Sequence, residues 1–227
     1  KHKKNDYIIM TYSIPTSLDE ITVEQYIKYQ EIINIPDLDS RALAIGTIAV
    51  FCNLTTDEVK LIPYKEFKET LEQIDKTLNS EAVFIPVYEN LGFIPNLDEI
   101  SAGEYIDLDT YSVEYKDYHR FLAVCYRPII KKGIAGYLIE EYKGTDETAN
   151  DMLKKPLSLL LGAQVFFWNL KKDLFSSILQ SLKNPSTKQQ SEADLQTNGD
   201  GIRRYTLLLQ ETLKIMNGQR SRIFTSF

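Results

Sequence analysis

Cysteine and histidine are scarce in this sequence, and the motifs that they build are missing. The 227 residues include two of each, and no zinc spacing, phosphate-binding loop or dinucleotide fingerprint occurs. Cys52 and Cys125 each lie inside an apolar stretch, where a small buried side chain is the usual role of a cysteine. The sequence therefore predicts no disulfide framework and gives no reason to expect a metal or cofactor.

Long apolar runs are also missing. The longest, LSLLLGAQVFFWNL at 157–170, is shorter than the roughly 20 residues that cross a bilayer, and it contains Gln164 and Asn169. The first residues combine a charged start with an apolar run that is too short for a signal peptide. We therefore expect no membrane span and a cytosolic or particle-associated location.

Positive charge is in the minority, with a net charge of −6 and a pI near 5.1. A dedicated nucleic-acid binder needs a concentrated basic surface, so no specific nucleic acid is expected as a partner. Net positive charge lies at the two ends: Lys1, Lys3 and Lys4 begin the chain, and residues 202–227 hold five basic side chains against one acidic. Such ends suit docking on acidic partners or on copies of the same protein, but solvated tails have the same composition.

The apolar content of 43% is enough for a core, and its spacing predicts mostly helices. Aromatic and β-branched residues at 7–14 predict a short strand before the first helix. Residues 23–34 and 64–78 predict amphipathic helices, and Thr22 with Gln25 and Thr55 with Glu58 have the spacing of a capping box. A helix capped by Asp39 or Ser40 is expected to run through RALAIGTIAVFC at 41–52; it is apolar on nearly every side, so we expect it to be central.

Strand and turn residues at 81–95 predict a β-hairpin, in which Pro86 confines the first arm to an edge or marks a break in it. The longest helix is expected at 156–182, with its first half in the core and its second half partly exposed. A polar linker at 184–201 and a last helix with a tail at 202–227 complete the chain.

One motif occurs twice, as IPTSLDEITVEQYI at 14–27 and as IPNLDEISAGEYI at 94–106. In both copies a hydroxyl residue precedes a helix by the spacing of a capping box. We therefore predict a mainly α-helical fold with a small β-hairpin or sheet element, built from two diverged copies of a strand-plus-helices unit. The predicted boundaries are 1–80 for the first copy and 81–183 for the second, which packs on the first.

Candidate catalytic groups do not form a recognisable constellation. His119 and Cys125 are six residues apart, which is not the spacing that shares a helix face. The acid pairs Asp19–Glu20 and Asp98–Glu99 precede helix starts, where the backbone dipole favours negative charge. We therefore predict that the chain is not an enzyme.

The C-terminal tail is the candidate partner-binding segment. It combines positive charge with late aromatic residues, which are enriched at protein interfaces. The predicted contact residues are Arg220, Arg222, Ile223, Phe224 and Phe227.

Several stretches together resemble a known group of proteins. They are the aromatic segment at 7–14, Ile14-Pro15, SLDEIT, FIPNLDEISAGEYIDLDTY, HRFLAVCYRP, YLIEEYKGT and LGAQVFFWNLKKDL, and the resemblance covers 7–182. This set is similar to small helical proteins encoded among the structural genes of tailed bacteriophages of Bacteroidota, including the crAss-like phages. The resemblance implies no catalytic residue.

The resemblance implies a structural component of the virion, such as a portal or tail ring component or a cargo protein packaged within the head or tail. Its partners would be other phage structural proteins and copies of itself, and its location the virion, assembled in the host cytoplasm. Two alternatives remain at this stage, a phage tail-assembly chaperone and a non-viral helical adaptor protein.

Overall fold

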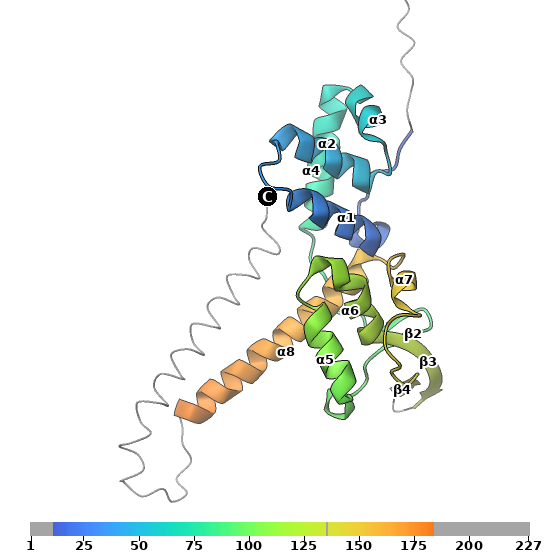
Figure 1. Cartoon of the computed structure of the whole chain (residues 1–227), viewed down its shortest axis with the longest axis vertical. Coiled ribbons are helices and arrows are strands. Elements are labelled where there is room, and N and C mark those ends of the chain that lie inside the picture. Colours follow the sequence, from blue (N-terminus) through green and yellow to red (C-terminus); the bar gives the residue numbers. More distant parts are fainter. Residues whose placement is uncertain (1–10, 135, 184–227) are drawn as a thin grey trace, which may run out of the picture. The chain divides into compact units, whose positions relative to one another are not determined.

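The computed structural model describes residues 11–134 and 136–183 (Figure 1). The chain divides inside its longest helix into two compact units, Lys1–Ala163 and Gln164–Phe227. The described residues form eight α-helices and a four-stranded antiparallel sheet. The predicted fold class, mainly helical with a small sheet, is confirmed. The boundary at residues 80 and 81 stays a prediction.

The first four helices gather in one group (Figure 1). Local side-chain chemistry sets their starts. Thr22 and Thr55 both complete the capping boxes expected of them, and the carboxylate of Asp39 accepts hydrogen bonds from the first amides of the second helix. The helices are α1 (Val23–Ile33), α2 (Ser40–Phe51), α3 (Thr56–Leu61) and α4 (Tyr64–Leu78).

The strand predicted at 7–14 is wrong where the structure describes it, because residues 11–14 form no strand. This segment is instead held by side chains of α4. The hydroxyl of Tyr12 donates to Glu66 at 3.0 Å, and the hydroxyl of Thr77 donates to the carbonyl of Pro15 at 2.9 Å. A sequence rich in β-branched residues has no strand partner here, so helix contacts determine its conformation.

The central position predicted for α2 is also wrong. Only Thr47, Ile48 and Phe51 of this helix are buried. The helices that pack on it, α1, α3 and α4, leave Leu43 and Ile45 half-buried. A helix with apolar residues on every side is therefore not always covered by other helices on every side.

The second group combines helices with the sheet (Figure 1). A predicted hairpin is present but shorter than expected, since β1 (Val87–Tyr88) begins after Pro86 and pairs with β2 (Leu91–Phe93). The helices are α5 (Ala102–Tyr111), α6 (Tyr118–Cys125), α7 (Ala149–Met152) and α8 (Leu157–Lys183). Between α6 and α7 lies a second hairpin, β3 (Tyr126–Gly133) and β4 (Gly136–Ile139), which the sequence analysis missed. The sheet order is β1-β2-β3-β4.

The repeated motif has the same local structure in both places. Each LDE forms a 3-10 turn, η1 (Leu18–Glu20) and η2 (Leu97–Glu99), and each is followed by a capped helix. Ser101 and Glu104 complete the second box, as Thr22 and Gln25 complete the first. The acids of the first copy are hydrogen-bonded: Asp19 accepts from the hydroxyl of Ser158 and Glu20 from the amide of Thr16.

The start of α1 is closed by a distant loop. The amide of Val23 donates to the carbonyl of Lys155, and the amide of Glu24 donates to that of Leu153, both at 2.9 Å. In return the amide of Leu157 donates to the carbonyl of Ile21 at 2.7 Å. Two first-turn amides that a helix leaves unpaired are thereby satisfied.

The first half of α8 is in the core, as predicted. Its buried residues surround the helix axis and include Leu157, Leu159, Leu160, Leu161 and Ala163. Gly162 lies against the backbone of the segment that precedes β1, because a Cβ at this position would be 2.5 Å from the carbonyl oxygen of Val83. Beyond Ala163 the described aromatic residues 166–168 are half-buried, and Leu170 is exposed.

Candidate interaction surface

The β3–β4 hairpin exposes more apolar surface than its size would suggest. Ile130 is 62% exposed, Leu138 is 55% exposed, and Ile134 at the turn is fully exposed. Two lysines, Lys131 and Lys132, are exposed beside them on β3. Exposed apolar residues that lie together mark interaction sites more often than scattered ones do.

The inner side of this hairpin is fixed to β2. The hydroxyl of Tyr137 donates to the carbonyls of Pro86 and Phe93, both at 2.9 Å. Its ring lies over Gly92, where a Cβ would be 2.8 Å from a ring carbon and 2.9 Å from a methyl carbon of Ile139. The exposed apolar residues therefore lie on a hairpin that is anchored at its base.

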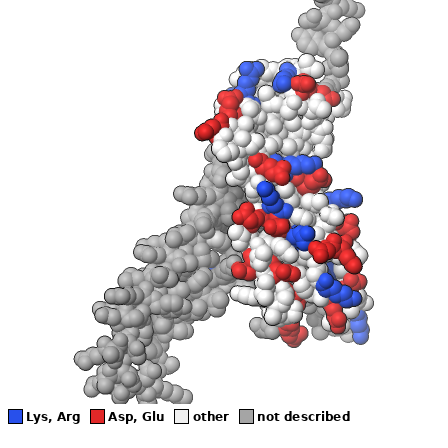
Figure 2. Space-filling view, in the orientation of Figure 1, with Lys and Arg blue, Asp and Glu red and all other residues white. Residues whose placement is uncertain are grey.

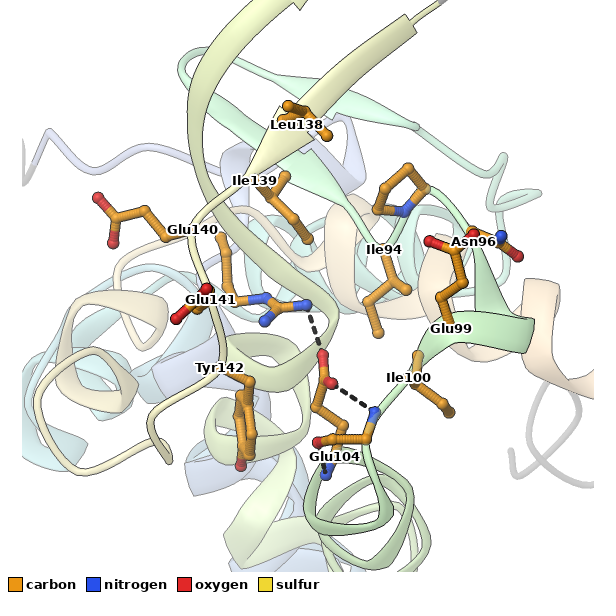
Figure 3. Close-up of a pocket in the computed structure, with 13 residues that line it drawn as sticks. Ile94, Asn96, Glu99, Ile100, Glu104, Leu138, Ile139, Glu140, Glu141 and Tyr142 are labelled. Atoms are coloured by element: carbon orange, nitrogen blue, oxygen red, sulfur yellow. Dashed lines mark hydrogen bonds and ion pairs between the residues drawn. The ribbon is translucent and has the colours of Figure 1, made fainter.

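A groove of about 450 Å³ opens beside the hairpin (Figure 3). Ile94, Asn96, Glu99 and Ile100 form one wall, and the end of β4 with Glu140, Glu141 and Tyr142 forms the other. The carboxylate of Glu140 is directed away from the groove (Figure 3). Glu104 lies at the base, where the chain enters α5.

A buried ion pair forms the floor of the groove. Nη2 of Arg127 lies 2.5 Å from Oε1 of Glu104, and the two side chains are 11% and 9% exposed. The other oxygen of Glu104 accepts the amide hydrogen of Ser101 at 2.8 Å, so the carboxylate serves the capping box and the pair together. The guanidinium lies 5.6 Å from the ring centre of Tyr142. Nε of Arg127 is buried without a hydrogen-bond partner among the described residues.

The phenol of Tyr142 joins this arrangement to α5 by donating a hydrogen bond to Asp107. Burial, followed by the neighbouring carboxylate of Asp107, raises the pKa of Tyr142. The phenol is therefore protonated and can donate a hydrogen bond across the physiological pH range. The arrangement is suited to holding the end of β4 against α5 rather than to proton transfer.

Comparison with protein-family models, with curated proteins and with solved structures found no match. The surface must therefore be interpreted from its own chemistry. No group of three or more potential metal ligands occurs among the residues that the structure describes. Within the same residues no helix is long and apolar enough to cross a membrane.

Charges of both signs are interspersed over the face shown in Figure 2. Several are paired on the surface, such as Lys28 with Glu24 at 2.7 Å and Lys60 with Asp57 at 2.8 Å. On that face no continuous basic area appears (Figure 2). Exposed pairs of this kind contribute little to stability.

His119 and Cys125 do not form a reactive pair. His119 and Cys125 both lie in α6, six residues apart, and therefore point in different directions. Burial, followed by the charge of Arg120, lowers the pKa of His119. Cys125 is completely buried, and burial raises the pKa of its thiol.

Both thiols are expected to be unreactive in the folded protein. Burial raises the pKa of Cys52 to about 11, so at pH 8 its thiolate fraction is on the order of a hundredfold below that of an exposed cysteine. Labelling with a thiol reagent should be negligible at pH 8 and should accelerate about tenfold per pH unit until the thiol ionises. In concentrated guanidinium chloride the chain unfolds, and both cysteines should then react at the rate of an exposed thiol. Native labelling of either at the rate of the unfolded chain would contradict their burial.

The predicted contact residues of the tail, Arg220, Arg222, Ile223, Phe224 and Phe227, lie outside the described residues. So do the linker predicted at 184–201 and the helix predicted after it. The sequence analysis also did not find the exposed hairpin or the Arg127–Glu104 pair. The run IIKKGIAGYLI at 129–139, in which β-branched and aromatic residues flank a segment with Gly133 and Gly136, is the signal that could have found the hairpin.

Proposed function

We propose that this chain is a structural component of a tailed bacteriophage virion and acts through protein–protein contacts. It would be a portal or tail ring component or a protein packaged within the head or tail. The motifs that resemble such proteins cover the described core, from SLDEIT through LGAQVFFWNL. The observation that best supports a contact role is the group of exposed apolar residues Ile130, Ile134 and Leu138 on a hairpin that Tyr137 anchors to β2.

The groove favours a structural role over a catalytic one. Its only strongly placed polar groups, Glu104 and Arg127, are already committed to each other and to the start of α5. A reaction site needs polar groups that converge on open space. The proposal therefore assigns the activity of the protein to its outer surface.

Mass spectrometry of purified particles of the encoding phage tests this proposal. A structural or packaged protein should be present in many copies relative to the major capsid protein, and should stay with the particle through a density gradient. The same measurement on infected-cell lysate is the control for expression. A chain abundant in the lysate but missing from particles would contradict the proposal and favour a tail-assembly chaperone.

A further inference from the structure

The strand β4 lies at the edge of the sheet, since β3 is the only strand that pairs with its backbone among the described residues. The amide of Glu140 donates to the carbonyl of Pro128 on β3 at 3.0 Å. Because backbone groups alternate in direction along a strand, those of Tyr137 and Ile139 point away from β3. An edge strand of this kind is a template for pairing with another chain.

Natural sheets usually protect such edges with charges, prolines or a covering element. Here the residue between the two outward-facing backbone positions is Leu138, which is 55% exposed. On the neighbouring strand Ile130 occupies an irregularity in the β3–β4 register and is 62% exposed. The edge is therefore apolar at its centre, which favours contact over protection.

Charges of opposite sign flank this apolar centre. Lys131 pairs with Leu138 across the hairpin, and Lys132 pairs with Tyr137. Both lysines therefore lie beside the middle of β4. Glu140 and Glu141 follow directly after β4 and are exposed. An antiparallel copy of the same strand would bring the acidic end of each hairpin towards the basic part of the other.

We infer that two copies of this protein pair through β4, antiparallel, about a two-fold axis at Leu138. Tyr137 of each copy then lies opposite Ile139 of the other, and these residues exchange the outward backbone hydrogen bonds. The two Leu138 side chains meet at the axis as a non-hydrogen-bonded pair, the closest type of cross-strand contact. The contact is self-complementary, as a two-fold interface requires.

The register also sorts the charges. Lys131 of one copy and Glu140 of the other lie on the same side of the joined sheet, and Lys132 and Glu141 lie on the opposite side. In both cases the two residues are two strands and two residues apart, so the charges approach only when both long side chains are extended. Gly136 lies opposite the incoming Glu140 and leaves room for it.

This inference rests on the proposed function only where it names copies of the chain as partners. It also distinguishes between the two virion positions that the proposed function leaves open, a ring component and a packaged protein. An isologous contact closes after two copies, whereas a cyclic ring needs a heterologous contact. The pairing therefore favours a protein packaged within the head or tail over a ring component.

Disulfide trapping in the full chain tests the pairing. Residues of a non-hydrogen-bonded pair are close enough for a disulfide, so Leu138→Cys should give a covalent dimer under mild oxidation. Ile130→Cys is the matched control, because it is equally exposed but three strands from its copy across the axis. Cys52 and Cys125 are buried and should not interfere. The expected yield of dimer is at least about tenfold higher for Leu138→Cys.

Light scattering of the uncross-linked protein gives a second measurement. Leu138→Lys should weaken dimer association by at least about tenfold, because it places two positive charges at the axis. Equal cross-linking of both cysteine variants, or none in either, would overturn the inference. So would a wild-type chain that stays monomeric. Trapping without presence in particles would contradict the proposed function alone, and presence in particles without trapping would contradict the pairing alone.

Discussion

Replacing Arg127 by methionine is expected to lower the free energy of unfolding by about 3–5 kcal/mol. The substitution keeps the apolar part of the side chain but leaves the carboxylate of Glu104 buried without its cationic partner. That carboxylate is 9% exposed and retains only the amide of Ser101 at 2.8 Å. Urea unfolding followed by far-UV circular dichroism measures the loss.

Arg120 provides the matched control. Its guanidinium also contacts a carboxylate, that of Asp146 at 2.9 Å, but the side chains are 34% and 89% exposed. Arg120→Met should therefore cost less than about 1 kcal/mol. Adding Glu104→Gln to Arg127→Met should recover part of the stability, because glutamine can still accept from Ser101 and carries no charge. Equal losses for Arg127→Met and Arg120→Met would show that the Arg127–Glu104 pair is hydrated in solution.

Gly162→Ala is expected to lower the free energy of unfolding by about 2–3 kcal/mol, although alanine is the better helix former. The added Cβ would lie 2.5 Å from the carbonyl oxygen of Val83 and 3.3 Å from Cα of Phe84. These are backbone atoms, so they cannot rotate away as a side-chain end would. Thermal and urea unfolding should both register the change.

Gly103→Ala separates this steric effect from helix propensity. Gly103 lies in the first turn of α5, and a Cβ there would meet only the hydroxyl of Ser101 at 3.8 Å. This substitution should be neutral or stabilise by up to about 1 kcal/mol. A Gly162→Ala variant as stable as the wild type would mean that α8 and the segment at 83 and 84 separate readily.

Features that depend on near neighbours in sequence could be predicted. The pairs Thr22–Gln25, Thr55–Glu58 and Ser101–Glu104 each form the capping box that their spacing indicates, because one turn of helix decides the outcome. The helix expected at 64–78 agrees with α4 at both ends, although no side chain caps its start. Its most buried residues are Thr70, Ile74 and Thr77, while the apolar Phe67 and Leu71 are only half-buried.

Features that depend on distant neighbours could not be predicted. Glu104 has the same capping role as Gln25, and nothing near it in sequence indicates that Arg127 lies beneath it. The β3–β4 hairpin has an ambiguous sequence signal, since Pro128 within β3 argues against a strand inside a sheet. In the structure Pro128 adjoins the register shift at Ile129 and Lys131, where the regular ladder is interrupted. The exposure of α2 depends on which helices pack around it, and composition does not specify that.

The loop that closes α1 also bears on how the protein is synthesised. Val23 and Glu24 leave the ribosome early, while Leu153 and Lys155, whose carbonyls complete their hydrogen bonds, leave it much later. The capping box of Thr22 and Gln25 is local, but until then the amides of Val23 and Glu24 can pair only with water. A chain released before residue 153 would leave both amides without these partners. The start of α1 therefore completes its hydrogen bonds late, because long-range contacts form only once both segments exist.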